Sequence, residues 1–353
     1  MEDKKPNSAI ERVENRIKPS TYSKAGVDIK KEGMVIKGIV SWAEKTFKFR
    51  EGKIGKPLAD IGTFANMVDL GDHRALVMCS DGVGSKVLVA QELEKYDTIG
   101  IDLVAMNAND AICVGAEPII MVDYLALENP NQDMVSEIGR GIYEGAKQAE
   151  VAVIGGETAT LPDMIKGVKN RGFDLAASLI GIVDKDKMVT GEKIRPGDKV
   201  IGFGSNGIHS NGLTLARKVL PRNMWMKLLE PTRIYVKEIL RLKDEYEIKG
   251  MAHITGTGML NLLRITKYGF LLDNMPEPQM IFKKIQELGR ISDEEMYQTF
   301  NMGVGFCLVV GEKDALKIEK KYGQEYRLDI IGTITDNHQV RIVKEGKTIV
   351  LEE

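Results

Sequence analysis

The feature that most constrains the fold is the stretch from Ser80 to Pro118, SDGVGSKVLVAQELEKYDTIGIDLVAMNANDAICVGAEP. The apolar run Ala75–Cys79 stops where this stretch begins, which predicts a β-strand that ends in a tight polar loop. The two glycines of the DGVG sequence let the loop backbone approach a ligand closely or adopt positive φ. Asp81 offers a hard oxygen ligand, and Lys86 offers a point charge suited to phosphate.

The second half of this stretch, Gly100–Gly115, has the apolar spacing of a helix. At about 100° per residue, Asp102 and Asn109 nearly eclipse, and Asp110 lies within the same quarter-turn. Three oxygen-bearing side chains on one helix face, beside a strand-end aspartate, can hold Mg²⁺ and a polyphosphate. The alternative is a solvated helix face next to a turn aspartate. The lysine and the glycines in the same run favour the ligand site.

Composition excludes several classes of protein. The 353 residues carry 49 Lys plus Arg against 51 Asp plus Glu, and this balance argues against a nucleic-acid or anionic-membrane partner. No predominantly apolar run is long enough to span a bilayer, and the N-terminal residues form no apolar leader. The three cysteines, Cys79, Cys113 and Cys307, are far apart among apolar neighbours, which predicts buried thiols in a reducing compartment. We therefore expect a cytoplasmic enzyme of about two domains.

A second predicted strand also ends in glycine and a carboxylate. Val151–Ile154 runs directly into a pair of glycines, the second of which is Gly156, followed by Glu157. Carboxylates at two strand ends of one sheet can meet at the rim of that sheet. We therefore pair Glu157 with Asp81.

A domain boundary is predicted after these motifs. Lys166–Gly172 is basic and contains glycine, and it lies between two apolar runs. The boundary divides the chain into an N-terminal domain, residues 1–170, and a C-terminal domain, residues 171–353. Phe173–Val183 is then the first strand of the C-terminal domain.

The C-terminal half repeats the strand–glycine–helix plan. The strand Lys199–Gly204 runs into the octet Ser205–Gly212, and a helix follows. Backbone amides at a glycine-rich strand-to-helix turn form an anion pocket, to which Asn, Ser and His side chains add neutral donors. His209 within this octet is either a capping residue or a ligand, and its setting favours the ligand role.

A second candidate anion pocket follows further along the chain. The strand in Gly250–Gly258 breaks into glycines and leads into a helix over Met259–Arg264. His253 lies within the strand, where we expect a core histidine whose ring nitrogens are satisfied. The sequence has no Walker A loop, no complete GxGxxG, no HExxH and no GxSxG, so nucleotide chemistry here does not use the common P-loop.

These motifs resemble those of the phosphoribosylformylglycinamidine cyclo-ligase family, also called aminoimidazole ribonucleotide (AIR) synthetase. The matching stretches follow the family order along nearly the whole chain. They are Tyr22–Ile29, Ser80–Lys86, Asp97–Asp110, Gly115–Pro118, Gly155–Ala159, Ser205–Gly212, Pro231–Lys237, Ala252–Gly258 and Glu295–Gly305.

The resemblance implies an α/β fold of the α+β type, with two domains that each carry a mixed β-sheet and helices on one face. It implies a homodimer whose N-terminal domains join through their sheets, and an active site in the cleft between the two halves. It also implies the reaction, in which ATP and Mg²⁺ convert formylglycinamidine ribonucleotide to 5-aminoimidazole ribonucleotide. ATP phosphorylates the amide oxygen, the amidine nitrogen attacks, and phosphate leaves as the ring closes.

Under this interpretation each motif residue has a predicted role. Three residues are assigned to catalysis: Lys86, Asp110 and His209. Four carboxylates are assigned to the metal: Asp81, Asp102, Asp110 and Glu157. The residues assigned to nucleotide or substrate phosphates are Asp81, Gly82, Gly84, Ser85, Asn109, Gly156, Asn206, Ser210, Asn211, Gly256 and Gly258. The sequence leaves open which glycine-rich loop holds ATP and which holds the substrate phosphate.

Two other functions remain as alternatives. The first is another ATP-dependent phosphotransferase of the same superfamily, such as thiamine-monophosphate kinase, which phosphorylates without closing a ring. The second is a non-catalytic nucleotide-binding or scaffold protein that retains the fold. Loss of the metal carboxylates would signal the scaffold, and all of them are present in this sequence.

Overall fold

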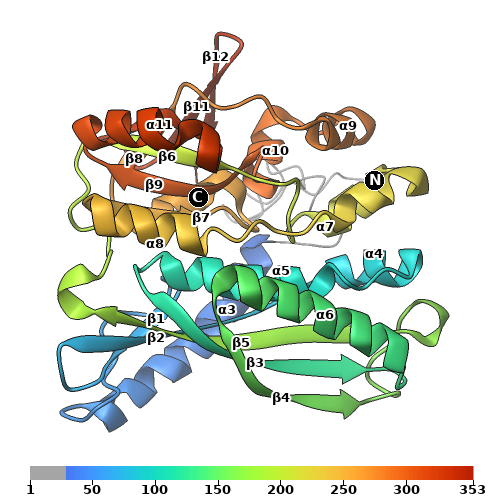
Figure 1. Cartoon of the computed structure of the whole chain (residues 1–353). Helices are drawn as coiled ribbons and strands as arrows, with labels where there is room; N and C mark the ends of the chain where they lie inside the picture. Colours follow the sequence, from blue (N-terminus) through green and yellow to red (C-terminus); the bar gives the residue numbers. More distant parts are fainter. Residues whose placement is uncertain (1–28, 353) are drawn as a thin grey trace, which may run out of the picture.

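The computed structural model describes residues 29–352 and consists of two α/β domains stacked one above the other (Figure 1). The first motif of the family resemblance, Tyr22–Ile29, lies outside the described residues except for Ile29. Each domain combines a mixed β-sheet with helices, which confirms the predicted fold class.

The N-terminal sheet has five strands within the described chain, in the order β1-β2-β5-β3-β4. Only β3 and β4 run parallel, and the other neighbours are antiparallel. The strands are β1 (Asn66–Asp69), β2 (Arg74–Gly82), β3 (Glu117–Leu127), β4 (Ala152–Thr160) and β5 (Phe173–Asp184). Along β2, buried Val77 and Cys79 alternate with exposed Met78, because successive strand side chains point to opposite faces.

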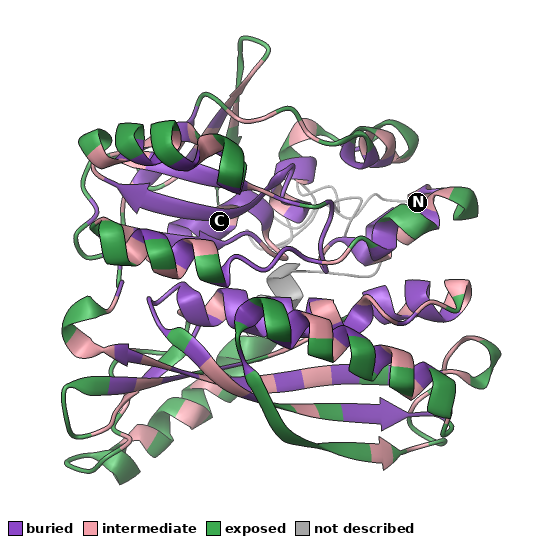
Figure 2. Cartoon of the chain, viewed as in Figure 1, coloured by how far each residue is buried: buried purple, intermediate pink, exposed green. Residues whose placement is uncertain are grey.

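Three helices of this domain cover one face of the sheet (Figure 1). They are α4 (Lys86–Leu93), α5 (Ile99–Ile112) and α6 (Gln132–Ala149), with α3 (Ile29–Ala43), η1 (Glu44–Arg50) and η2 (Val168–Asn170) elsewhere in the domain. Glycines allow α5 and α6 to approach closely: a Cβ on Gly100 would stand 2.1 Å from the backbone N of Ile142. Almost every residue of α5 is buried, because the sheet lies below it and the C-terminal domain above it (Figure 2).

The predicted domain boundary is wrong. β5 does not begin the C-terminal domain, because it lies between β2 and β3 at the centre of the N-terminal sheet. The N-terminal domain therefore continues to Asp184, and the connection to the next sheet is the segment 185–198. The basic segment Lys166–Gly172 is a loop within the first domain.

The C-terminal sheet has seven strands in the described chain, in the order β12-β11-β8-β10-β6-β9-β7. The strands are β6 (Lys199–Gly204), β7 (Ile248–His253), β8 (Gly269–Leu272), β9 (Val304–Val310), β10 (Leu328–Thr335), β11 (Val340–Lys344) and β12 (Lys347–Leu351). β9 is buried along its whole length, which explains its continuous apolar sequence VGFCLVV.

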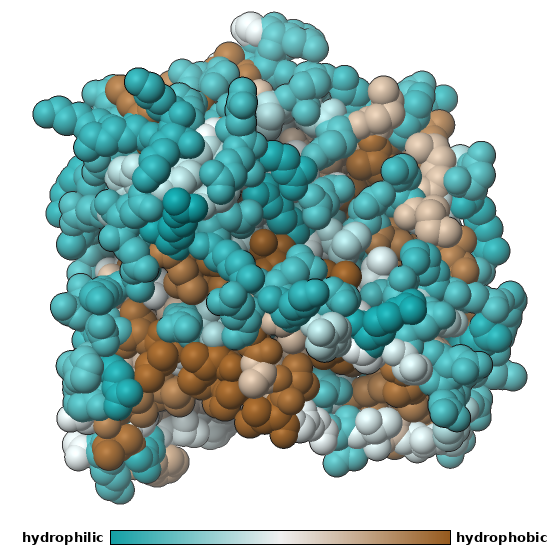
Figure 3. Space-filling model, viewed as in Figure 1, coloured by the Kyte–Doolittle hydropathy of each residue, from teal (hydrophilic) through white to brown (hydrophobic). Residues whose placement is uncertain are grey.

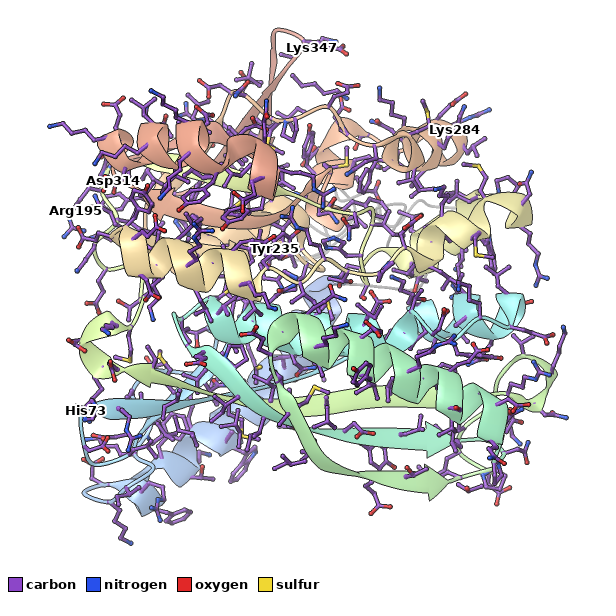
Figure 4. The ribbon with its side chains drawn as sticks, in the orientation of Figure 1. His73, Arg195, Tyr235, Lys284, Asp314 and Lys347 are labelled. Atoms are coloured by element: carbon purple, nitrogen blue, oxygen red, sulfur yellow. The ribbon has the colours of Figure 1, made fainter. Side chains whose placement is uncertain are left out.

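The helices of this domain are α7 (Leu213–Val219), η4 (Arg222–Leu229), α8 (Val236–Glu245), η5 (Gly258–Ile265), α9 (Met280–Gly289), α10 (Asp293–Thr299) and α11 (Glu312–Tyr326), and the connection before it contains η3 (Lys185–Lys187). α11 packs on β10 and β6, whereas α8 lies against α5 and α6 of the other domain. The two domains therefore meet through a helical layer, with Tyr235 at its centre in Figure 4. Over residues 29–352, none of the helices has the length and apolarity needed to cross a membrane.

Candidate active site

Asp81 lies at the end of β2, where the glycine-containing loop begins. The side chain of Asn107 on α5 holds this strand end: its Oδ1 accepts from the Asp81 backbone N–H at 3.0 Å, and its Nδ2 donates to the Asp81 carbonyl at 3.2 Å. The Gly82 N–H donates to Asp81 Oδ1 at 2.7 Å. The strand–loop prediction is confirmed, and an amide of α5 fixes the position of the aspartate.

Asp110 lies near the C-terminal end of α5 and contacts a histidine of the other domain. His253 Nδ1 is 2.9 Å from Asp110 Oδ1, and His253 is fully buried at the end of β7. The second ring nitrogen of His253 lies 3.4 Å from Asn109 Nδ2. His253 is thus a satisfied core histidine, as expected, but the residue that satisfies it is a predicted catalytic carboxylate.

Asp81 and Asp110 are close enough to repel one another. Burial, together with the negative charge of Asp110, raises the pKa of Asp81 to about 6. A carboxylate in this setting is suited to a divalent cation, because a cation offsets the neighbouring negative charge.

Lys86 and Asp102 do not face a ligand site, which corrects the predicted roles of both. They form an ion pair in which both side chains are 0% exposed, with Lys86 Nζ 2.8 Å from Asp102 Oδ2. Asp102 Oδ1 also accepts from the N–H and the hydroxyl of Thr232, each at 2.7 Å. Neither group faces an open ligand site in this arrangement, because both side chains are fully buried and Lys86 Nζ is bound by Asp102 and by the Glu230 carbonyl.

Asn109 is also used within the protein. Its Nδ2 donates to the Arg233 carbonyl at 2.9 Å, and its Oδ1 accepts from the Tyr235 N–H at 3.0 Å. The predicted common face of Asp102, Asn109 and Asp110 therefore exists, but it is turned toward the C-terminal domain. Its side chains join the two domains.

Glu157 does not meet Asp81 within one chain, so the predicted pairing is wrong. β5 and β3 lie between β2 and β4, which separates the two strands by about 14 Å at the usual strand spacing of ~4.7–4.9 Å. Asp81 is in register with buried Ala177, whereas Glu157 is in register with Tyr124, which is 41% exposed on the opposite face. Gly156 lies on the same edge strand, against the side chain of Asp123. In residues 29–352, no three His, Cys, Asp or Glu side chains form a preformed metal cluster.

The octet Ser205–Gly212 forms a tight loop after β6, as predicted. His209 adopts positive φ (59°), and its Nε2 accepts from the backbone N–H of Asn206 at 3.3 Å. Burial lowers the pKa of His209 well below its ordinary value, so the ring is neutral. Its Nδ1 and the Nδ2 of Asn211 are buried, and neither has a hydrogen-bond partner in the described part of the chain. Two buried donors without partners make this loop suited to a ligand that supplies a hydrogen-bond acceptor.

The two glycine-rich loops meet. A Cβ on Gly256 would stand 3.2 Å from Asn211 Oδ1, so the loop after β7 lies against the octet. Gly258 requires positive φ (54°) and lies against the carbonyl of Tyr297. The predicted anion pockets are therefore neighbours in one region of the C-terminal domain.

The other residues assigned to phosphate include several whose side chains contact protein groups. Asn206 Oδ1 accepts from Arg327 at 2.8 Å, and Ser210 Oγ is 3.2 Å from Thr232 Oγ1. Ser85 Oγ lies 3.1 Å from Thr214 Oγ1 of α7, across the domain boundary. Gly84 has positive φ (67°) and open space around it, so its loop can approach a ligand.

A cavity of about 220 Å³ lies between the domains. Its lining includes Cys113, which follows Asp110 by three residues, and Met251, which precedes His253 by two on β7. Phe64 and Arg264 also line it, with the guanidinium 4.1 Å above the ring centre of the phenylalanine. The cavity thus provides largely apolar space between residues of the two domains.

Sequence reasoning missed several residues that organise the site. Asn107, Thr232 and Arg233 each hold a predicted site residue through hydrogen bonds. Thr232 and Arg233 lie in the motif Pro231–Lys237, which marked the family resemblance without indicating a role. Their partners are more than a hundred residues away in sequence, so no local pattern could identify them.

The chain matches one protein family over both of its domains. Residues 62–183 match the family model "AIR synthase related protein, N-terminal domain", and residues 195–345 match "AIR synthase related protein, C-terminal domain". The phosphoribosylformylglycinamidine cyclo-ligase of Pyrococcus furiosus is 51% identical over 341 residues, which cover 92% of this chain and 99% of the relative. The chain belongs to the phosphoribosylformylglycinamidine cyclo-ligase family. The cyclo-ligase of Methanocaldococcus jannaschii is 46% identical over 94% of this chain and 97% of its own length.

Solved structures share the fold of this cyclo-ligase family member at low sequence identity. "AaThiL complexed with AMPPCP and TMP" has a TM-score of 0.63 at 15% identity, and covers 88% of this chain and 94% of that chain. "Hydrogenase Maturation Protein HypE in complex with ATP" has a TM-score of 0.60 at 17% identity, over 78% of this chain and 84% of that chain. At these identities the likeness demonstrates the fold alone.

Proposed function

We propose that this protein is an ATP-dependent cyclo-ligase that converts formylglycinamidine ribonucleotide to 5-aminoimidazole ribonucleotide, ADP and phosphate. The proposal rests on the extended identity with cyclo-ligases and on one observation in the site. That observation is the placement of two carboxylates: Asp81 lies at the strand end beside the glycine loop of the first domain, and Asp110 contacts His253, which directly precedes a glycine-rich loop of the second.

The reaction has two bond exchanges. The γ-phosphoryl group of ATP passes to the amide oxygen of the substrate and ADP departs. The amidine nitrogen then attacks the activated carbon and loses a proton, and phosphate leaves with the former amide oxygen. Both exchanges need positioning and charge neutralisation rather than a protein nucleophile.

The carboxylate pair fits Mg²⁺. This ion is usually held by one or two carboxylates together with substrate phosphates and water, so a preformed protein cage is not required. Asp81 and Asp110 would hold it, and the bound ion would neutralise charge on the triphosphate. His253 fixes the orientation of Asp110 through the 2.9 Å contact.

The glycine-rich loops of the C-terminal domain are proposed to bind phosphate. Asn211 Nδ2 and His209 Nδ1 are buried donors without partners in the described residues, and a phosphate oxygen would supply the missing acceptor. Gly256 beside Asn211 leaves space for that oxygen, because any side chain there would crowd the amide. Both loops therefore serve one anion-binding region, whether its occupant is the ribosyl phosphate or the nucleotide.

We further propose that the protein is a homodimer joined through the outer face of the N-terminal sheet. Met78, Val122 and Tyr124 are exposed on this face, at 46%, 40% and 41% respectively. Figure 3 shows a continuous hydrophobic area over the lower, N-terminal part of the molecule. Exposed apolar area of this kind favours association, and β4 offers an unpaired strand edge.

A cytoplasmic location is proposed from the cysteines. All three are buried and unpaired in the described chain, which suits a reducing compartment.

The activity test separates this proposal from its alternative. Purified protein is given ATP, Mg²⁺ and formylglycinamidine ribonucleotide, and ADP release and product mass are followed. A cyclo-ligase releases ADP only with both substrates present, and its product lacks the elements of water relative to the substrate. A phosphotransferase would instead yield a product heavier by a phosphoryl group. No turnover by a well-folded protein would refute both.

A further inference from the structure

The buried pair Lys86–Asp102 lies where the two domains meet. Besides Asp102, Lys86 Nζ donates to the carbonyl of Glu230 in the C-terminal domain at 2.7 Å. Both side chains of the pair are 0% exposed. A lysine of the N-terminal domain is therefore held by one carboxylate of its own domain and one backbone carbonyl of the other.

Thr232 extends this contact to the octet loop. Its backbone N–H and its hydroxyl both donate to Asp102 Oδ1 at 2.7 Å. Since its hydroxyl proton is used on Asp102, its oxygen accepts from Ser210, whose Oγ is 3.2 Å away. One hydroxyl thus connects Asp102 of the first domain to the loop Ser205–Gly212 of the second.

We propose that Lys86, Asp102 and Thr232 form an interdomain pin that sets the octet loop relative to the carboxylates Asp81 and Asp110. The pin consists of positioning residues, and none of its members contacts a substrate. This proposal rests on the proposed function only because it assigns catalysis to Asp81 and Asp110, the carboxylates that the pin aligns.

A charged pin has a physical advantage for alignment. A buried ion pair contributes little net stability compared with an apolar pair of the same volume, since desolvation offsets the attraction. Its hydrogen bonds are directional, however, and removing one partner leaves the other buried and unpaired. The pair therefore disfavours any domain arrangement in which Thr232 or Glu230 lies elsewhere.

The test uses paired substitutions. Lys86→Met and Asp102→Asn each remove one charge, whereas the double variant removes both and keeps an acceptor for Thr232. Thr232→Val removes only the hydroxyl and is the mildest change. Lys95→Met is the matched control, because Lys95 forms a partly exposed pair with Asp97 at 2.7 Å in the same domain.

Activity distinguishes a pin from a phosphate contact. Lys86→Met should lower kcat/KM by roughly 100-fold, the scale expected for misplacing reacting groups by about 1 Å. The double variant should recover to within about tenfold of wild type, because neutralising both partners removes the unpaired charge. If Lys86 instead touches phosphate, the double variant will stay as impaired as Lys86→Met, and the pin is overturned.

Hydrogen exchange gives a readout that does not depend on turnover. Peptides covering 205–212 and 230–235 should exchange faster in Lys86→Met and Thr232→Val, and at the wild-type rate in Lys95→Met. The double variant should lie between these two groups, because it keeps an acceptor for Thr232 but lacks the Lys86–Glu230 hydrogen bond. Unchanged exchange in Thr232→Val, which should fold normally, overturns the pin even if activity falls. If the exchange pattern appears but the wild type does not close the ring, the pin stands and the proposed function fails.

Discussion

His253 Nδ1 lies 2.9 Å from Asp110 Oδ1, so a fully buried histidine of the C-terminal domain holds a carboxylate of the N-terminal domain. His253 directly precedes the glycine-rich segment 254–258, and Asp110 shares its environment with Asp81. The contact therefore links the proposed metal site to the proposed phosphate loops. Any relative movement of the domains would displace this carboxylate.

Replacing His253 tests whether this contact orients Asp110. His253→Leu should lower kcat by roughly 10–100-fold, the loss typical of removing a partner that orients a metal ligand. His253→Asn is the matched variant, because its amide nitrogen can donate from nearly the position of Nδ1. It should retain most of the activity lost in His253→Leu, as measured by steady-state ADP release. Equal losses in the two variants would contradict an orienting role.

Asp110→Asn tests the proposed metal carboxylate itself. The substitution keeps the volume and a hydrogen-bond acceptor but removes the negative charge. It should reduce catalysis by about tenfold or more and raise the Mg²⁺ concentration needed for half-maximal rate, with little change in thermal stability. Asp133→Asn on the exposed surface of α6 is the control and should behave as wild type. A fully active Asp110→Asn would remove Asp110 from the metal site.

Asp81 makes stability depend on pH in a defined direction. Its pKa is raised to about 6 by burial and by Asp110, so the folded chain holds this proton to higher pH than the unfolded chain, whose value is about 3.9. The contribution of this group to the free energy of unfolding is greatest below about pH 4 and is lost as the pH rises through about 6. Asp81→Asn should therefore unfold at a higher temperature than wild type at pH 8.

The same comparison at low pH supplies the control. At pH 4 the wild-type carboxyl is protonated in the folded state, so the two proteins should have the same unfolding temperature. Mg²⁺ with ATP should stabilise the wild type more at pH 8 than at pH 5, because protons compete with the cation below the pKa. If the difference in unfolding temperature between wild type and Asp81→Asn is the same at both pH values, the pKa of Asp81 is not raised by folding.

The proposed dimer is tested on the outer face of the N-terminal sheet. Tyr124→Lys places a charge where the partner sheet would pack, so it should shift the protein to monomer in sedimentation velocity at micromolar concentration. Leu316→Lys on α11 is the control, because Leu316 is 57% exposed on the far domain. A monomeric wild type, or a Tyr124→Lys protein that stays dimeric, would count against this interface.

Local sequence patterns determined several strands, loops and helices of this protein. The alternation along β2, the glycine loop after it and the helical spacing of α5 predict those elements, because burial and backbone freedom act on neighbouring residues. The motif order also determined the family. Each of these features depends on residues within a few turns or one strand of each other.

Tertiary structure alone decided which elements and side chains meet. The sequence of β5 does not say that it pairs with β2 and β3, so the domain boundary was predicted too early. Glu157 resembles Asp81 in its local setting, yet the strand order puts the two acids on separate strands and opposite faces. The sequence around Lys86 predicts a phosphate contact, but in the structure its Nζ is bound by Asp102 and by the Glu230 carbonyl. The physical reason is common to all three: strand order and the partners of buried charges are set by contacts between distant residues, which no local pattern encodes.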